Sequence, residues 1–327
     1  MTSAGDWRPT ARLEALAARA RVLAEIRGFF AEAGVLEVET PALSFAGSTD
    51  PALASLSTRY TGPAAPHGAT LWLQTSPEFA MKRLLAAGSG SIWQLCKVFR
   101  DGERGSRHNP EFSLLEWYRP GLAMEALIDE VTALLRRVLG GDLREERLTY
   151  AAAFARALGI DPHRATVETL QAVAVTAGIA AVECLRLADR DAWLDLLMTH
   201  GVEPALGADG ITVVLDYPPS QAALARVRLG EQPVAERFEV YVRGVELANG
   251  FHELADAAEQ RRRFEADNMR RRSAGLPEVP IDERLLAALE AGLPDCCGVA
   301  LGVDRLVMLA TGAQRIDEVV AFPLERA

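Results

Sequence analysis

The stretch FRDGERGSRHNPEF, residues 99–112, joins two apolar segments and holds more charged and aromatic side chains than a plain hairpin connection needs. Strands are expected over 92–100 and 112–118, so the pattern predicts an antiparallel pair joined by a long polar loop. Arg100 at a strand end offers phosphate a bidentate fork, and Phe112 offers a nucleobase a flat apolar surface. Taken singly, each residue is more often structural. Their combination points to a triphosphate site.

A second cluster is the segment ELANGFHE, residues 246–253. Residues two apart share a strand face, whereas Glu246 and Glu253 are seven apart, so a bulge or kink near Gly250 is needed to turn both the same way. With that kink, the two carboxylates share a Mg²⁺ ion that bridges phosphates. Without it, one glutamate is solvated. For His252, a hydrogen-bonded side chain is favoured over a proton shuttle, although no local signal decides between them.

A third cluster is the segment GVALGVDRL, residues 298–306. Gly302 lets the backbone approach a ligand closely, and Arg305 begins a helix whose N-terminus favours anions. An arginine at that place also supplies a counter-charge for a terminal phosphate. The alternative is purely structural: Asp304 caps the helix and Arg305 is exposed.

The chain around these clusters reads as a mixture of strands and helices. No regular alternation of strand and helix appears, and neither GxGxxG nor GxxxxGK[ST] occurs, so an α+β fold with a largely antiparallel sheet is expected instead of a Rossmann fold. Helical periodicity without chemical motifs indicates a helical insertion at about 122–205. The other predicted elements are a helix over 11–33, a strand over 35–40 ending at Pro41, a loop over 44–70, a strand over 71–74, a helix over 76–87 capped by Ser76, strands over 211–216 and 235–242, a helix over 256–274, and a strand and helix over 298–310.

Composition indicates a globular protein of one large or two modest domains: 327 residues, 49% hydrophobic and 24% charged. The net charge of -10 opposes general attraction to nucleic acid, and the Arg261 to Arg263 run is interpreted as a solvated helix face. No long apolar run or signal peptide is present, so the cytoplasm is expected and a membrane is not. Cys96, Cys184, Cys296 and Cys297 lack CxxC spacing, so neither disulfides nor a zinc site is expected.

The three clusters together resemble a known family. The segment through Pro41, the loop over 99–112 and the residues from Gly302 to Arg305 look like motifs 1, 2 and 3 of class II aminoacyl-tRNA synthetases, in the same order. RHNPEF at 107–112 and ELANGFHEL at 246–254 are similar to lysyl-tRNA synthetase, over nearly the whole chain. The resemblance implies a class II antiparallel sheet flanked by helices, a single catalytic domain, and a homodimer built by motif 1.

Two departures separate the chain from a lysyl-tRNA synthetase. The helix before motif 1 begins within a dozen residues of Met1, so no anticodon-binding domain is expected. Ala300 stands where the synthetase has glycine, and His252 where it has serine. In both departures the chain resembles ligases that consist of the synthetase catalytic domain alone and join (R)-β-lysine to a lysine of elongation factor P. This resemblance implies an adenylate-forming ligase that uses ATP and Mg²⁺ and has no stable tRNA partner.

The resemblance also carries roles onto matching positions. One mismatch remains, because the family's motif 2 reads Arg, any residue, Glu, whereas Gly102 fills the last place here and Glu103 follows. Amino-acid binding is implied for Ser76, Pro77, Glu78, Tyr118, Glu253 and Ala300, with Glu78 pairing an ammonium group of the substrate. ATP binding is implied for Arg100, Asp101, Gly102, Asn109, Phe112, Glu246, Leu247, Gly302 and Arg305. Catalytic roles fall on Arg100, Glu246, Glu253 and Arg305, and metal binding on Glu246 and Glu253.

Two alternatives stay open at this point. One is a lysyl-tRNA synthetase-like enzyme that charges tRNA with the adenylate. The other is a non-catalytic sensor of an amino acid, which the retained triphosphate ligands Arg100, Glu246, Glu253 and Arg305 argue against. The ligase reading requires that Arg100 and the two glutamates surround the same nucleotide.

Overall fold

The computed structural model describes residues 7–65, 67–180, 182, 185, 187 and 189–327. The chain forms two compact units, one of residues 1–123, 137–139 and 254–327, the other of residues 124–136 and 140–253. Cys96, Cys296 and Cys297 are free thiols, while Cys184 lies outside the described residues. Within the described part of the chain, no helix is long and apolar enough to cross a membrane.

The first unit contains two sheets and five α-helices among its described elements. These elements are α1 (Leu13–Glu32), β1 (Leu36–Glu37), β2 (Leu43–Ser44), β3 (Ser57–Tyr60), β4 (Ala69–Leu73), α2 (Glu78–Ala86), β5 (Ile92–Phe99), β6 (Glu111–Pro120), α7 (Ala257–Ser273), α8 (Glu283–Gly292), β12 (Cys296–Gly302), α9 (Val303–Thr311), η5 (Ile316–Glu318) and η6 (Leu324–Arg326). One sheet has the order β1-β5-β6-β12, with β1 parallel to β5 and the remaining pairs antiparallel. The other has the antiparallel order β2-β4-β3.

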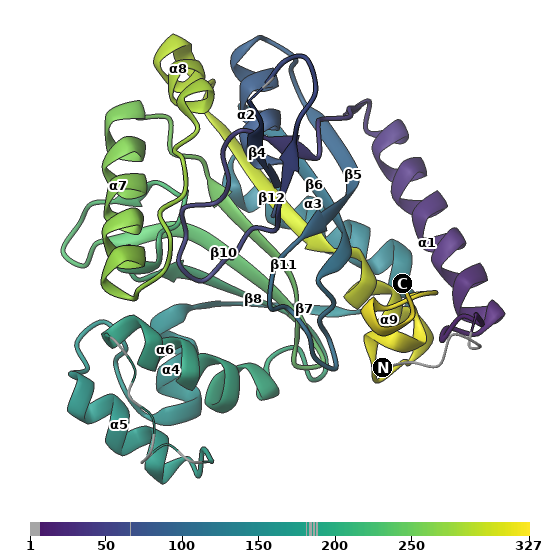
Figure 1. Ribbon diagram of the computed structural model, residues 1–327. Coiled ribbons are helices and arrows are strands. Elements are labelled where there is room, and N and C mark those ends of the chain that lie inside the picture. The colour runs from purple at the N-terminus through teal and green to yellow at the C-terminus, as the bar shows by residue number, and fades with distance from the viewer. Residues whose placement is uncertain (1–6, 66, 181, 183–184, 186, 188) are drawn as a thin grey trace. The chain divides into compact units, whose positions relative to one another are not determined.

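Helix α1 covers β5 and β6 through aromatic packing. Phe30 stacks on Trp93 of β5, with ring centroids 4.9 Å apart, and meets Trp117 of β6 edge-on at 5.3 Å. The apolar stripe predicted over 11–33 therefore faces the core, as its fully buried Ile26 also shows. In Figure 1, α1 (purple) runs beside α9 (yellow). This packing holds rigid the two strands from which the loop over 101–110 emerges.

The second unit combines a mixed sheet with a helical cluster. Its described α-helices and strands are α3 (Met124–Leu139, whose last three residues count with the first unit), β7 (Arg144–Thr149), α4 (Tyr150–Leu158), α5 (Val167–Thr176), α6 (Arg190–Leu197), β8 (Gly210–Tyr217), β9 (Val227–Arg228), β10 (Val234–Val242) and β11 (Val245–His252). The sheet order is β11-β10-β8-β7, with β9 paired to β10. Helices α4, α5 and α6 (teal in Figure 1) pack around a core that includes Tyr150, Phe154 and Trp193.

The predicted α+β class and most predicted elements are confirmed, and the exceptions lie at sheet edges. The strand predicted over 35–40 is only Leu36–Glu37, because β1 is an edge strand that pairs with β5 over two residues. The loop predicted over 44–70 contains β3 (Ser57–Tyr60), and the helical insertion contains β7 (Arg144–Thr149). Both missed strands are polar and mostly exposed, so they lack the apolar alternation that identifies a half-buried strand.

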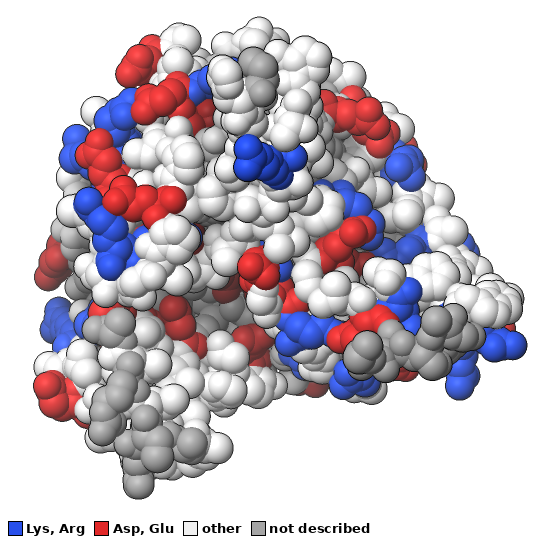
Figure 2. All heavy atoms as spheres, in the orientation of Figure 1, with Lys and Arg blue, Asp and Glu red and all other residues white. Residues whose placement is uncertain are grey.

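The charged helix α7 carries paired ions on its surface. Figure 2 shows blue and red side chains interleaved over this helix. Arg261 lies 2.5 Å from Glu283, and Arg262 and Arg263 lie 2.5 and 2.9 Å from Glu259. The run of arginines is therefore matched by neighbouring acids, as a solvated face requires, and does not form a separate phosphate site.

Candidate active site

A buried carboxylate on β6 is the centre of one group of polar side chains. Glu116 is 2% exposed and accepts two hydrogen bonds, from Ser76 Oγ at 2.7 Å and from the Tyr118 hydroxyl at 2.6 Å. Ser76 Oγ also accepts the backbone N–H of Glu78 at 3.0 Å, so it closes the start of α2, with Pro77 at the cap position. We call Ser76, Glu78, Glu116 and Tyr118 the carboxylate pocket.

The two acids of the carboxylate pocket differ in how their charges are balanced. The Glu78 carboxylate pairs with Lys82 Nζ, one helical turn away, at 2.5 Å. Glu116 instead receives neutral hydroxyl donors. Burial, and then the nearby Glu78 carboxylate, raise the pKa of Glu116 to about 7. A cation beside Glu116 would restore its ionised form, so this pocket is suited to an ammonium group.

The raised pKa of Glu116 predicts a pH-dependent stability of the ligand-free protein. The folded-state pKa of about 7 lies above the ordinary value of 4.5, so the folded chain binds the extra proton between these values. The contribution is complete below the lower pKa and is lost as the pH rises through the upper one. Thermal unfolding at pH 5 and pH 8 should show a smaller difference for Glu116→Gln than for wild type. An equal difference in both proteins would contradict this assignment.

The strands next to β6 place further residues beside Glu116. Glu116 lies directly opposite Gln94 on β5 and Ala300 on β12. Gly298 on β12 lies opposite Tyr118. Directly opposed residues share a face of the sheet, so the Ala300 methyl group lies beside the Glu116 carboxylate. The structure thus brings Ala300 to the same pocket as Ser76, Glu78 and Tyr118.

The stretch over 99–112 surrounds Arg100 at the end of β5. The Arg100 guanidinium lies over the Phe112 ring, 5.0 Å from its centroid, and 3.8 Å from a Glu103 carboxylate oxygen. Gly102 has a φ of +77°, a left-handed conformation that a glutamate at this place would adopt only with strain. The glycine that replaces the family's motif 2 glutamate is therefore explained by the conformation of the turn. Glu103, one residue later, lies close to Arg100 instead.

His108 connects this loop to helix α9. Its Nε2 atom lies 2.7 Å from Arg305 Nη2 and 3.6 Å from Glu103. Burial, and then the Arg305 guanidinium, lower the pKa of His108, so the imidazole is neutral near pH 7. A guanidinium only donates, and the contact therefore requires a neutral ring that accepts. Arg305 and the loop that follows Arg100 thus meet at His108, and the role of Arg100 and Arg305 as nucleotide ligands stays a prediction.

Gly302 and Asp304 anchor the start of α9. Gly302 occupies the cap position of the helix, and no side chain caps it. Asp304 is buried, pairs with Arg19 of α1, and accepts the backbone N–H of Ser113 at 2.6 Å. The alternative in which Asp304 caps the helix is therefore wrong. Its carboxylate instead ties α9 to α1 and β6, which fixes the place from which Arg305 projects.

The second unit holds the remaining predicted residues on β11. Glu246 lies opposite Tyr241, Asn249 opposite Glu239 and Phe251 opposite Arg237. These partners alternate along β10, so Glu246, Asn249 and Phe251 share one face, and Glu253 follows Phe251 by two residues. The odd spacing of the two glutamates is absorbed by a register shift.

The register shift lies at Leu247, not near Gly250 as the sequence suggested. Tyr241 pairs with Glu246 and Val240 with Ala248, which leaves the buried Leu247 as the extra residue. Such a bulge inverts the alternation of side chains beyond it. The chain thus contains the bulge that is needed for Glu246 and Glu253 to share a face.

The face of β10 beneath these residues carries a buried charge network. Arg237 pairs with Glu239, which also accepts hydrogen bonds from the hydroxyl groups of Tyr217 and Tyr241. Arg237 Nε donates to Asn249 Oδ1 at 3.2 Å, and its guanidinium lies 4.5 Å from the centroid of the Tyr217 ring. This network holds Asn249, and through it β11, in a defined orientation.

His252 lies at the end of β11. Its Nδ1 atom is 2.8 Å from Glu236, which favours the hydrogen-bonded interpretation of this histidine. Glu253 is buried next to it, and the Glu253 backbone carbonyl accepts Arg226 Nε at 3.2 Å.

Sequence reasoning missed Glu116 and the Arg237 and Glu239 pair. A single acid inside the apolar run over 112–118 was the available signal, because an ionisable group in a buried strand needs a partner.

Asp101 is exposed, and the Asn109 side chain donates to the Glu111 carbonyl at 2.7 Å. Arg100 belongs to the first unit and the two glutamates to the second, so their predicted convergence on one nucleotide stays a prediction.

The chain belongs to the class II tRNA synthetases, in the group named for D, K and N, whose family model matches residues 4–326. Relatives named elongation factor P (R)-β-lysine ligase match the full length. Two, both from Klebsiella pneumoniae, are 54% identical over 327 residues, which is 100% of this chain and of each relative. A third, from Yersinia enterocolitica, is 53% identical over the same complete length.

Proposed function

We propose that this protein is a ligase that activates (R)-β-lysine with ATP as an acyl-adenylate and joins it to a lysine side chain of elongation factor P. The observation that carries the proposal is the 54% identity to a ligase of that name over the whole length of both chains. The carboxylate pocket supports it, because Glu116 lies buried with hydroxyl donors where a substrate ammonium group would balance its charge.

Activation takes place where Arg100 and Arg305 meet the loop over 101–110. The β-lysine carboxylate oxygen attacks the α-phosphorus of ATP, the bond to the bridging oxygen breaks, and pyrophosphate leaves. Charge grows on the phosphate oxygens during this step, and fixed guanidinium groups oppose it without needing to reorganise. The amine of the acceptor lysine then attacks the acyl carbon and releases AMP and a proton. No covalent bond to the protein forms.

Glu246 and Glu253 are the residues that would hold Mg²⁺. Within the described residues, no group of three or more Asp, Glu, His or Cys side chains is arranged as a metal cage. Two carboxylates completed by phosphate oxygens and water fit the usual way in which proteins bind this ion. The bulge at Leu247 puts Glu246 and Phe251 on one face, which supports the same face for Glu253 two residues further on. Bound there, the ion would supply charge neutralisation to the phosphates.

A homodimer is part of the proposal. Leu36, Leu43 and Phe45 are large apolar side chains that are 56%, 45% and 51% exposed, and they flank Pro41 in the segment that resembles motif 1. Apolar groups gathered at the surface support an interface between copies of the chain. Action in the cytoplasm on a protein acceptor, without a stable tRNA partner, completes the proposed function.

Ala300 is expected to help the enzyme distinguish β-lysine from α-lysine. The Ala300 methyl group lies beside Glu116, and removing one methyl from a pocket changes discrimination by roughly 10- to 200-fold. Ala300→Gly should therefore raise kcat/KM for α-lysine relative to (R)-β-lysine by about 10-fold. Pyrophosphate exchange with each amino acid measures this ratio. A ratio equal to that of wild type would show that Ala300 does not contribute to the discrimination between the two amino acids.

Pyrophosphate exchange with α-lysine and with both enantiomers of β-lysine tests the proposed function. We expect the fastest exchange with (R)-β-lysine. A large preference for α-lysine, together with efficient charging of tRNA, would favour the tRNA-charging enzyme. No exchange with any of the three amino acids, despite their binding, would favour the sensor.

A further inference from the structure

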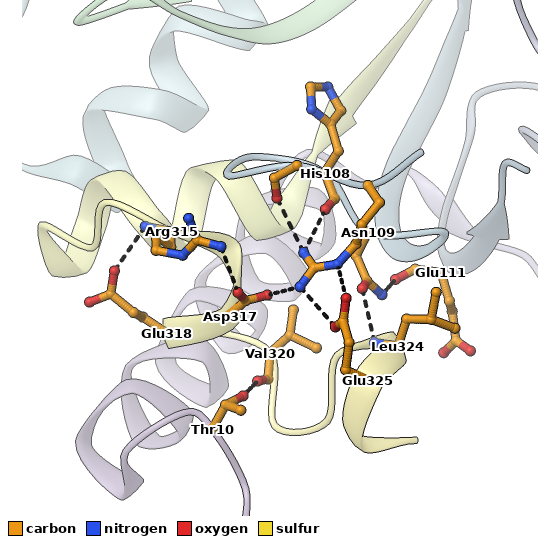
Figure 3. Close-up of polar contacts among 12 residues, drawn as sticks. Thr10, His108, Asn109, Glu111, Arg315, Asp317, Glu318, Val320, Leu324 and Glu325 are labelled. Carbon is orange, nitrogen blue, oxygen red and sulfur yellow. Dashed lines mark hydrogen bonds and ion pairs between the residues drawn. The ribbon is translucent and has the colours of Figure 1, made fainter. Parts of the chain in front are cut away.

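The C-terminal segment over 316–325 is fastened to the loop over 101–110. The Ile316 backbone N–H donates to the Ser106 carbonyl at 2.7 Å, and the Leu324 N–H donates to Asn109 Oδ1 at 3.2 Å. Figure 3 shows Asp317, Leu324 and Glu325 facing the loop at His108 and Asn109. We call these contacts, together with those of Arg104 below, the C-terminal clamp.

Arg104 is the centre of the C-terminal clamp. Its Nε and Nη2 atoms donate to the two carboxylate oxygens of Glu325 at 2.6 and 2.8 Å, and Nη2 lies 3.0 Å from Asp317. On the other side, Nη1 donates to the carbonyls of Gly105 and His108 at 3.2 and 3.4 Å. One planar group thus binds two acids of the tail and the turn of its own loop, an arrangement that the single ammonium of lysine does not reproduce.

The same turn presents His108 to the active site. Gly105 and His108 form a bridge, in which the Gly105 N–H donates to the His108 carbonyl at 3.2 Å. The His108 carbonyl therefore faces Arg104, while the His108 ring lies 2.7 Å from Arg305. A displacement of Arg104 would shift this turn, and with it the His108 contact that holds Arg305.

We propose that Arg104 is a positioning residue, which through the C-terminal clamp fixes the loop over 101–110 so that His108 holds Arg305 in place for the nucleotide. The inference rests on the proposed function, because the nucleotide site is the one assigned there. The competing interpretation is a surface ion pair without consequence, since exposed pairs contribute little to stability. Arg261 with Glu283 is such a pair, also bidentate and distant from the loop in sequence, and it supplies the control.

The test compares Arg104→Met with Arg261→Met in the full-length protein. Misplacing a catalytic group by about 1 Å costs roughly 100-fold in rate, so kcat/KM for ATP in pyrophosphate exchange should fall about 10- to 100-fold in Arg104→Met only. The KM for (R)-β-lysine and the melting temperature should match those of Arg261→Met. Arg104→Lys keeps the charge without the fork and should restore only part of the loss.

A second readout does not depend on activity. Hydrogen exchange of the backbone amides over 102–109, without ligands, should be about 10-fold faster in Arg104→Met than in wild type or Arg261→Met. Unchanged exchange would overturn the clamp whatever the activity of wild type. A faster loop with unchanged kcat/KM for ATP would overturn the positioning role. An inactive wild type would remove the proposed function, while hydrogen exchange would still decide whether Arg104 orders the loop.

Discussion

Replacing Arg100 by methionine is expected to lower kcat/KM for pyrophosphate exchange roughly 10²- to 10³-fold, the usual cost of removing one preorganised donor from a developing charge. Methionine keeps much of the side-chain length and can still pack on the Phe112 ring, which the guanidinium now covers at 5.0 Å. The lower kcat/KM should therefore come from weaker stabilisation of the phosphate charge, and the stability of the fold should not change. Steady-state exchange over a range of ATP concentrations measures it, beside thermal unfolding.

Arg261→Met is the matched control for this substitution. Arg261 also pairs with a glutamate, on the surface between α7 and α8, and has no proposed role at the nucleotide. It should retain the wild-type rate. If Arg100→Met exchanged pyrophosphate as fast as Arg261→Met, Arg100 would not be a phosphate ligand and the nucleotide site would lie elsewhere.

Replacing Glu116 by glutamine should reduce kcat/KM for (R)-β-lysine about 100-fold and leave the KM for ATP unchanged. The amide keeps the shape of the side chain, accepts a hydrogen bond from one of the Ser76 and Tyr118 hydroxyl groups and donates to the other, but it removes the charge that an ammonium group would meet. Truncating one partner of a buried charge pair costs roughly 2 to 5 kcal/mol, which is the origin of this magnitude.

The fold tolerates the glutamine because Glu116 has a pKa of about 7 and is already partly protonated in the free protein. Glu283→Gln, at an exposed acid of α8, controls for the loss of a carboxylate as such. A wild-type kcat/KM for β-lysine in Glu116→Gln would show that the ammonium group binds at another acid. A parallel loss with ATP would indicate a general defect of the site.

The sequence predicted best the segments whose apolar residues recur at helical spacing or gather in short runs. The helix over 11–33 buries one face, and the strands over 92–100 and 235–242 are apolar because they are largely buried on both faces. The clusters at Arg100 and Arg305 were also foreseen, and the contact of His108 with Arg305 now brings them together. Their density of charge in short segments was a local signal.

Contacts between distant segments were not predictable from one sequence. Glu116 is paired to Ser76, 40 residues away, and Arg104 to Glu325, 221 residues away, and neither partner carries a local mark. The sequence required a bulge in this strand, but the prediction placed it near Gly250 and the structure has it at Leu247. Glycine is the usual signal for a bulge, and Gly250 was the nearest glycine. Edge strands such as Arg144–Thr149 were missed since backbone pairing, not an apolar face, defines them.

The intact mass of elongation factor P, after incubation with the protein, ATP and (R)-β-lysine, tests the central claim most directly. We predict the addition of one β-lysyl group to one lysine of elongation factor P, dependent on ATP and strongly reduced with Arg100→Met. The account would be contradicted if elongation factor P stayed unmodified while the same preparation of the enzyme exchanged pyrophosphate and attached its amino acid to tRNA.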